Sequence, residues 1–449
     1  MALNDVSRRR LLRGGAAAAA APAWLLAGRP PALAQGARPF QGVTLNVSCW
    51  SAPYARAVAD YLPEFTQATG IRVNYDTPGF PIYNQRADLE LSTKGSAFDV
   101  LNVTFIYTSR WIGAGWFTPL DDFINDRSKT PADWDFADFL PGTVQPMKDR
   151  AGKVYGAPWV ADVLVGGAGR FDLLRAAGFG MPDTFAELDR ALAAVNGKED
   201  LPAFITENHY GWTFVPFLQG FGGNVFRNPP GDLFPTLDTP EAVEAAEFMA
   251  KLLRQYGPPQ ALGYDVDQTT QAFRNGRVSY TLNNHAFLLP AAEPGSRIRE
   301  TCNFSLFPAG PKGRFPGIAS HAWGIPSGSR NKDAAWEFIK WAVSKEMLTR
   351  MVAEKGLGAV TRASVLNAPG FRERTTINGF DMTQLYVDTL ALAAQGHMRY
   401  RTVHVYPQAN QQITKAIERV VSGQMGARES LRQAQQNAIA DLRRAGVRF

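Results

Sequence analysis

Strand-like and helix-like segments alternate between residues 43 and 103, and this alternation limits the possible folds more than any other feature of the chain. In the strand-like segments apolar and polar side chains alternate, as they do when one face of a sheet is buried. The first helical segment places Val58, Tyr61 and Phe65 on one face and ends at Gly70, a residue type common at helix ends. We predict strands over 43–48, 71–75 and 99–103, and helices over 53–68 and 83–92. This order is typical of an α/β fold, in which helices connect the strands of a sheet.

Later helices carry recognisable start signals. Thr184 followed by Glu187 has the capping-box pattern, and Thr239-Pro240 combines a cap residue with a first-turn proline. Asn331 is expected to cap a third helix, and residues 408–444 have a helical composition with one interruption. The α/β pattern therefore extends over the whole chain.

The first 34 residues have the order of a bacterial export signal. A basic segment, Ser7–Arg13, precedes a mildly apolar stretch, Gly14–Ala27, and Ala32-Leu33-Ala34 gives an A-x-A cleavage pattern. Its adjacent arginines resemble the twin-arginine type of signal. The apolar run is shorter than the ~20 residues of a membrane span, so a membrane anchor is not predicted. We expect cleavage after Ala34, no lipid anchor because no cysteine lies nearby, and a periplasmic mature protein.

The charge balance argues against nucleic acid as a partner. The formal net charge is +6, and the first 34 residues supply four of these charges because they hold five arginines and one aspartate. The remaining chain is long enough for two domains and has no basic stripe.

Two cysteines, Cys49 and Cys302, could form one disulfide in an oxidising compartment. The alternative, which we favour, is that both are small buried apolar side chains. Export of an already folded protein from a reducing cytosol weakens the case for a required bridge.

The common signatures of enzymes are missing. None of the five histidines forms an H-E-x-x-H pair, and neither a C-x-x-C zinc arrangement, a G-x-S-x-G elbow nor a phosphate-binding G-x-x-x-x-G-K-[ST] loop occurs. The sequence therefore predicts no catalytic residues, no metal site and no cofactor.

Aromatic and amide side chains instead follow several predicted strands. Trp50 and Tyr54 follow the first strand, and Tyr107 follows the third. Ligands of α/β sheets bind beyond the carboxyl ends of the strands. A sugar needs flat apolar faces to stack on and a few amide or carboxylate partners for its hydroxyl groups. These positions are therefore candidates for a carbohydrate site as a group, although a single aromatic residue is more often part of the core than of a pocket.

Several motifs, in their order and spacing, resemble periplasmic solute-binding proteins of ABC importers. The resemblance is to the sugar-binding group that includes maltodextrin-binding proteins, and it covers essentially the whole chain after the signal. The motifs are 69–73 (TGIRV), 155–159 (YGAPW) followed by Asp162, 170–174 (RFDLL), 273–277 (FRNGR), 307–311 (FPAGP), 331–336 (NKDAAW), 356–362 (GLGAVTR) and Ser422-Gly423.

The resemblance implies the two-lobed periplasmic binding protein fold (type II, Venus-flytrap), with several hinge crossings near 157–165, 300–308 and 355–362. It implies that lobe one comprises 35–157 and 308–357, and lobe two 158–307 and 358–449. Where the family often has a stacking tryptophan, this chain has 283–287 (NNHAF), so a smaller sugar or a polyol is as plausible as a maltodextrin. Together with the strand-end positions, the resemblance gives these candidate ligand-binding residues: Trp50, Tyr54, Tyr107, Arg110, Trp159, Asp162, Trp212, Asn224, Asn284, His285, Phe287, Trp323 and Tyr406.

The implied function is capture of a sugar, small oligosaccharide or polyol between the lobes by a monomeric protein, and its delivery to an inner-membrane ABC permease. Closure around the ligand, without any bond made or broken, is the expected mechanism. A charged ligand such as a phosphate ester is an alternative, with Arg110 and Arg362 as possible donors. A secreted carbohydrate-active enzyme is a further alternative, since glycosidase carboxylates need not be close in sequence.

Overall fold

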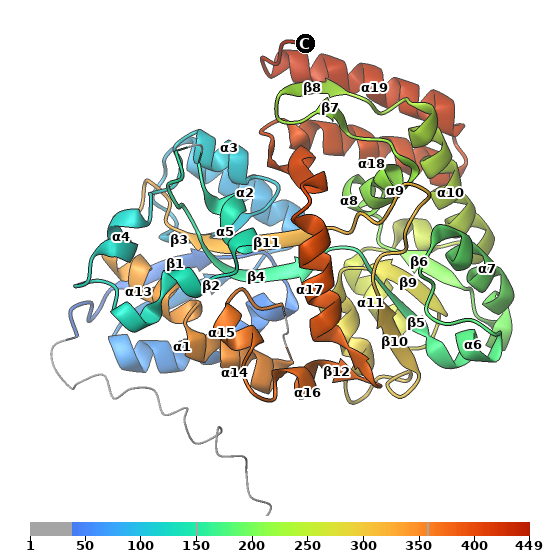
Figure 1. Cartoon of the computed structure of the whole chain (residues 1–449). Coiled ribbons are helices and arrows are strands. Elements are labelled where there is room, and N and C mark those ends of the chain that lie inside the picture. The colour runs from blue at the N-terminus through green and yellow to red at the C-terminus, as the bar shows by residue number, and fades with distance from the viewer. Residues whose placement is uncertain (1–37, 150, 357–358) are drawn as a thin grey trace, which may run out of the picture. The chain divides into compact units, whose positions relative to one another are not determined.

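Two β-sheets organise residues 38–449 in a computed structural model of the protein (Figure 1). The structure describes residues 38–149, 151–356 and 359–449. The predicted signal segment 1–34 and its cleavage position lie outside these residues, as do positions 357–358 of the third predicted crossing.

The first sheet has the strand order β2-β1-β3-β11-β4. Strand β1 is parallel to β2 and β3, whereas β11 is antiparallel to both β3 and β4. The strands are β1 (Thr44–Ser48), β2 (Arg72–Asp76), β3 (Val100–Thr104), β4 (Ala157–Val163) and β11 (Ile318–Gly324). The three strands predicted between 43 and 103 are thus confirmed within one residue at each end.

The second sheet has the strand order β10-β5-β9-β6. Strand β6 is parallel to β9, and β5 is antiparallel to both β9 and β10. The strands are β5 (Gly166–Arg170), β6 (Phe204–Thr206), β9 (Tyr280–Asn283) and β10 (Cys302–Ser305). Two hairpins lie outside the sheets: β7 (Phe226–Asn228) with β8 (Asp232–Pro235), and β12 (Thr376–Ile377) with β13 (Phe380–Asp381).

We call the first sheet with its helices lobe one, and the second sheet with its helices lobe two. In lobe one, α1 begins at Pro53, contains Pro63 and ends where Gly70 adopts a left-handed conformation. The helices of lobe one are α1 (Pro53–Thr69), α2 (Phe80–Ser92), α3 (Thr108–Gly113), α4 (Asp121–Asn125), α5 (Pro141–Val144), α13 (Lys332–Ala342), α14 (Lys345–Lys355), α15 (Ala363–Leu366) and α16 (Phe371–Thr375).

In lobe two, the predicted caps of two helices are present. The Thr184 hydroxyl accepts the Glu187 N–H at 3.1 Å, and the Thr239 hydroxyl accepts the Ala242 N–H at 3.3 Å. The helices of lobe two are α6 (Phe171–Ala176), α7 (Phe185–Val195), α8 (Tyr210–Thr213), α9 (Val215–Phe221), α10 (Pro240–Tyr256), α11 (Val266–Arg274), α12 (His285–Leu288), α18 (Tyr406–Ser422) and α19 (Ala427–Arg444).

The predicted capping role of Asn331 is wrong. Helix α13 does begin after Asn331, but the Asn331 side chain makes no cap hydrogen bond. Its amide nitrogen instead donates to the Asp99 carboxylate at 3.2 Å, because the buried Asp99 lies next to this helix start and competes for the amide.

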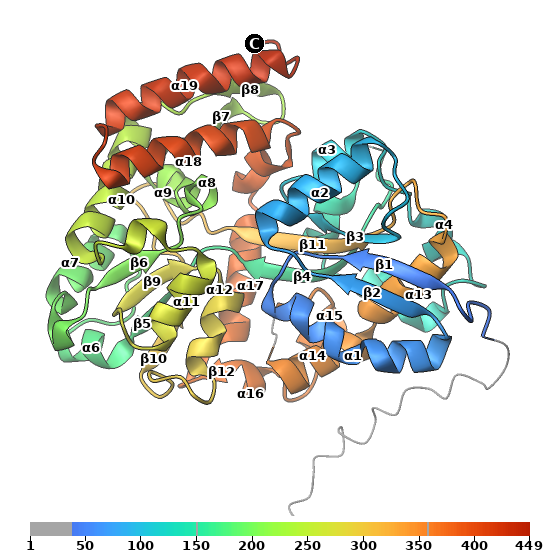
Figure 2. The same ribbon diagram turned by 180° about the vertical axis from the view of Figure 1, so that it is seen from behind.

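The chain passes from lobe one to lobe two between β4 and β5, at Leu164-Val165, and returns between β10 and β11, over 306–317. Helix α17 (Met382–Ala393) runs between the lobes and leads through a 310 helix, η8 (His397–Thr402), to α18 (Figures 1 and 2). Strand β4 thus belongs to the first sheet, whereas the resemblance assigned residues from 158 onward to lobe two.

Cys49 and Cys302 are both free thiols and both buried. Cys49 follows β1 of the first sheet, and Cys302 begins β10 of the second. The disulfide alternative is therefore wrong, and the two side chains are buried as small apolar groups.

Candidate ligand-binding cleft

The two crossings make the carboxyl ends of several strands face each other between the lobes. The chain leaves the first sheet at the end of β4 and enters the second at the start of β5, which pairs with the end of β9. Because β4 is oriented like β1 and β3, the residues after all three strands lie at this boundary. On the other side, β6 and β9 are parallel and end at the same boundary. We call this region the interlobe cleft.

Aromatic rings from the two lobes contact each other across the cleft. The Trp50 ring, after β1, is stacked on Phe287 of α12, with centroids 6.2 Å apart and an interplanar angle of 19°. The Phe80 ring, at the start of α2, meets Trp212 of α8 edge to face at 5.7 Å. Phe105, after β3, also contacts Trp212 at 6.5 Å. The structure therefore shows the two lobes in contact. The aromatic side chains determine how closely the lobes approach each other.

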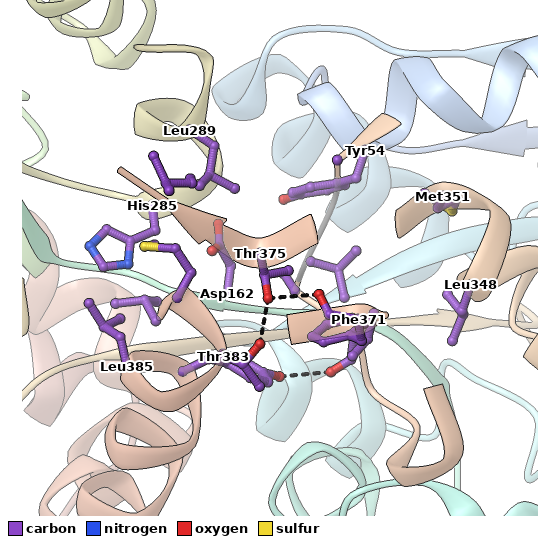
Figure 3. Close-up of a pocket in the computed structure, with 18 of the residues that line it drawn as sticks. Tyr54, Asp162, His285, Leu289, Leu348, Met351, Phe371, Thr375, Thr383 and Leu385 are labelled. Carbon is purple, nitrogen blue, oxygen red and sulfur yellow. Dashed lines mark hydrogen bonds between the residues drawn. The ribbon is translucent and has the colours of Figure 1, made fainter. Parts of the chain in front are cut away.

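A cavity of about 80 Å³ lies at the hinge side of the cleft, with room for a few water molecules (Figure 3). Tyr54 of α1, Trp159 and Asp162 of β4, and His285 of α12 line one part of it. The segment from α14 to α17 lines most of the remainder with the apolar side chains Leu348, Met351, Val360, Phe371, Ile377, Met382 and Leu385, together with Thr375, Thr383 and Tyr386. In the view of Figure 3, Asp162 lies between His285 and Tyr54, so polar groups from both lobes meet at this wall.

Buried polar atoms without a hydrogen-bond partner surround this part of the cleft. They include Trp50 Nε1 and Tyr54 Oη from lobe one, and Asn283 Nδ2 from lobe two. Each of these side chains is less than 9% exposed. Burying an unpaired donor is costly, so such groups are characteristic of a site that provides partners to a bound molecule.

A second buried carboxylate, Glu207, follows β6 and is 3% exposed. It accepts a hydrogen bond from Trp212 Nε1 at 2.9 Å and lies 3.1 Å from His209 Nδ1. Although burial lowers the pKa of His209, the hydrogen bond and charge of Glu207 raise it above its ordinary value. The Trp212 ring at the interlobe contact is thus held in place by Glu207.

Two other histidines at the cleft are held neutral by burial. Burial lowers the pKa of His285 to about 4 and that of His321 to about 3. The His285 imidazole lies against the first residue of β5: a side-chain Cβ at Gly166 would lie 2.0 Å from Nε2. His321, on β11, contacts Trp50 at 5.6 Å and Phe105 at 5.6 Å between ring centroids.

Seven of the thirteen candidate residues lie at the cleft: Trp50, Tyr54, Trp159, Asp162, Trp212, His285 and Phe287. Asn284 joins them by position, because it follows β9 and is 6% exposed. Tyr107 is half-buried and stacks on Trp111 of its own lobe at 5.0 Å.

The other four candidates are engaged elsewhere. Arg110 forms an ion pair with Asp88 at 2.8 Å, and Asn224 is exposed just before the β7–β8 hairpin. Trp323 is fully buried in the lobe-one core against Trp159 and Phe338. Tyr406 donates its hydroxyl to the Gly211 carbonyl at 2.9 Å inside lobe two.

Sequence reasoning missed four residues near the cleft: Phe80, Glu207, His321 and Arg401. Glu207 follows a strand, as Trp50 and Phe105 do, so the strand-end rule could have found it. The strand before Glu207 has three residues, too few for a recognisable periodic pattern. His321 and Arg401 reach the cleft only through tertiary packing.

No group of three or more metal-ligating side chains suited to hold a metal ion is present among the described residues. Within the same part of the chain, no helix is long and apolar enough to cross a membrane.

The family model for bacterial extracellular solute-binding proteins matches residues 51–348. This span includes most of the chain, the crossings from β4 to β5 and from β10 to β11, and all strands of the second sheet. The chain belongs to this family. As a solute-binding protein, it consists of two α/β lobes.

Relatives of this solute-binding protein include the mannitol-binding protein of Pseudomonas aeruginosa, 26% identical over 380 residues that cover 81% of this chain and 85% of the relative. The erythritol/L-threitol-binding protein of Mycolicibacterium smegmatis is 25% identical over 332 residues, 70% of this chain and 69% of the relative. An ABC transporter solute-binding protein of Agrobacterium radiobacter, solved in complex with ribitol, superimposes with a TM-score of 0.80 at 21% identity, covering 89% of this chain and 98% of that one. The predicted two-lobed α/β fold is thereby confirmed.

Proposed function

We propose that this solute-binding protein captures a neutral polyol or small sugar in the interlobe cleft and delivers it to an inner-membrane ABC permease. The observation that carries the proposal is the meeting of buried polar side chains from both lobes. Tyr54 and Asp162 of lobe one line one cavity together with His285 of lobe two, and Glu207 and Asn283 lie at the ends of β6 and β9 on the lobe-two side. Hydroxyl groups both donate and accept hydrogen bonds, so a polyhydroxylated ligand can satisfy carboxylates and amides at once. Two relatives are named for polyols, which supports the same ligand class.

In this proposal the ligand is bound by closure. A ligand that bridges the lobes gains its full set of contacts only in the closed state, so its binding shifts the population toward that state. The Trp50–Phe287 and Phe80–Trp212 contacts then form together with the ligand contacts. The permease would distinguish the closed from the open protein, and no bond is made or broken.

Both arginines on which the sequence analysis based the charged-ligand alternative are engaged in ion pairs within the protein. Arg110 is paired with Asp88, and the fully buried Arg362 is paired with Asp138 at 3.3 Å. We continue to propose that the protein binds its ligand and is not an enzyme. In this proposal it acts as a monomer and does not bind nucleic acid. The export signal at 1–34 supports a periplasmic location, with the twin-arginine route as the proposed path.

Thermal unfolding of the purified protein against a panel of sugars, polyols and anionic metabolites tests the proposal. A ligand present at a thousand times its Kd stabilises the folded state by about 4 kcal/mol, which raises Tm by several degrees. We expect a polyol or monosaccharide to give this shift and to remain chemically unchanged during incubation. A shift only with a phosphate ester, or consumption of the compound, would contradict the proposal.

A further inference from the structure

Arg401 is a buried charge beneath the interlobe aromatic contacts. Three arginines are buried among the described residues. Arg170 pairs with Asp172 and Glu199, and Arg362 pairs with Asp138. Arg401 is 2% exposed, yet none of the described carboxylates forms an ion pair with it. A guanidinium stays protonated when it is buried, so this charge must be compensated by something other than an ion pair with a described carboxylate.

The surroundings hold the guanidinium in one orientation. Nε donates to the hydroxyl of Tyr400 at 2.9 Å, and Nη1 lies 3.5 Å from the carbonyl oxygen of Ile318 at the start of β11. The Phe105 ring lies under the guanidinium, 5.3 Å from its central carbon. These contacts leave Nη2 buried and without a partner.

This position lies where the core of lobe two, to which Phe105 and Tyr400 belong, meets the interlobe contacts. The same Phe105 ring touches Trp212 of lobe two and His321 of β11. A Cβ at Gly317, in the second crossing, would lie 3.1 Å from Arg401 Nη2 and 3.1 Å from Leu164 of the first crossing. Arg401 therefore lies where both crossings pass beneath the interlobe contacts.

We propose, resting on the proposed function, that Arg401 is the specificity-determining donor of the site and binds the oxygens of adjacent hydroxyl groups of a neutral polyol through Nη2. An amino group offers two N–H bonds, and the fixed plane of the guanidinium directs them toward neighbouring oxygens. The cleft also contains the buried carboxylates Asp162 and Glu207. They accept hydrogen bonds from hydroxyl groups but repel an anionic ligand, so the mixed charge favours a neutral one.

Calorimetric titration of D-mannitol into the wild-type protein and three variants tests this proposal. Arg401→Met keeps an apolar stem over Phe105 but removes every N–H, so we expect Kd to rise by about 10- to 100-fold. Arg401→Lys keeps the charge without the planar donor pair, so we expect an intermediate loss. Arg362→Met is the matched control, because it removes an equally buried arginine that is already paired. It should lower Tm and leave the Kd of the folded protein within about threefold.

Each result tests either the role of Arg401 or the class of ligand. If Arg401→Met and Arg401→Lys bind D-mannitol as tightly as the wild-type protein does, the role of Arg401 is overturned and the proposed function is left intact. Tighter wild-type binding of D-gluconate than of D-mannitol overturns the neutral ligand, since it assigns Nη2 to a carboxylate. Binding of neither compound, nor of any sugar or polyol of the thermal-unfolding panel, at 10 mM, about ten times the weakest Kd considered (~1 mM), overturns both the polyhydroxylated class and the proposed function. If Arg401→Met does not fold, Arg401→Lys must still lose affinity for the proposal to stand.

Discussion

Acidification should destabilise this protein through two buried histidines of the cleft. Burial holds the pKa of His285 at about 4 and that of His321 at about 3, whereas an unfolded histidine titrates near 6.5. The folded state therefore binds fewer protons than the unfolded state between these values. It follows that stability is present above pH 6.5 and is lost as the pH falls toward 4 and 3.

The magnitude follows from the two pKa differences. Between pH 7 and pH 4.5 the unfolded chain protonates both side chains while the folded chain leaves them mostly neutral. Each histidine then contributes a loss of about 2 to 3 kcal/mol in the free energy of unfolding, or about 5 kcal/mol for the pair. His209 acts in the opposite sense, because its raised pKa adds stability below its unfolded value, and that stability is lost as the pH rises through its folded pKa.

Urea unfolding at pH 7 and pH 4.5 measures this effect by comparison of variants. Paired carboxylates also lose stability in acid, so the informative quantity is the difference between wild-type and variant. His285→Gln and His321→Gln should each remove about 2 to 3 kcal/mol of the pH-dependent loss. An equal pH dependence in all three proteins, or an NMR titration of His285 near pH 6.5, would refute the reasoning.

Three further predictions concern packing at the cleft. Gly166→Ala places a methyl group on the His285 ring and should lower stability by about 1 to 3 kcal/mol and weaken ligand binding, whereas Gly142→Ala, with open space at its Cβ, should not change binding. Trp50→Ala removes the ring stacked on Phe287, so we expect a shift of about 0.5 to 1.5 kcal/mol toward the open state, seen as a larger radius of gyration by small-angle scattering. Trp341→Ala, a ring packed within lobe one, should leave that radius unchanged. Glu207→Gln removes the charge that raises the pKa of His209, so the NMR titration of His209 should move to lower pH, and an unmoved titration would show that Glu207 is not the cause.

Local signals predicted much of the fold. The strands and helices between 43 and 103 follow from side-chain periodicity, which burial of one face imposes on the sequence. The starts of α7 and α10 follow from Thr184 and Thr239, because a cap hydroxyl bonds an amide only three residues away. The capping prediction for Asn331 was wrong for the opposite reason, since its hydrogen-bond partner Asp99 lies far from it in the sequence.

Part of the cleft was also predictable from strand ends. Trp50 and Tyr54 were found because the carboxyl ends of parallel strands share one edge of a sheet, and Asp162 was found through the family resemblance. The same rule could not tell Trp323, which lies in the core, from residues that reach the cleft. Which face of a strand meets the other lobe depends on how the two sheets are connected.

The sequence by itself determined the class of fold, the family resemblance and several residues of the cleft. These features depend on periodicity, caps and motif spacing, which are local properties of the chain. Only the tertiary structure decided that Glu207 holds Trp212, that His285 packs against Gly166, and that Arg401 is buried without a carboxylate. The physical reason is that burial and pairing are set by contacts between distant segments. The ring of Phe105 and the guanidinium of Arg401 meet only because the chain passes between the lobes more than once.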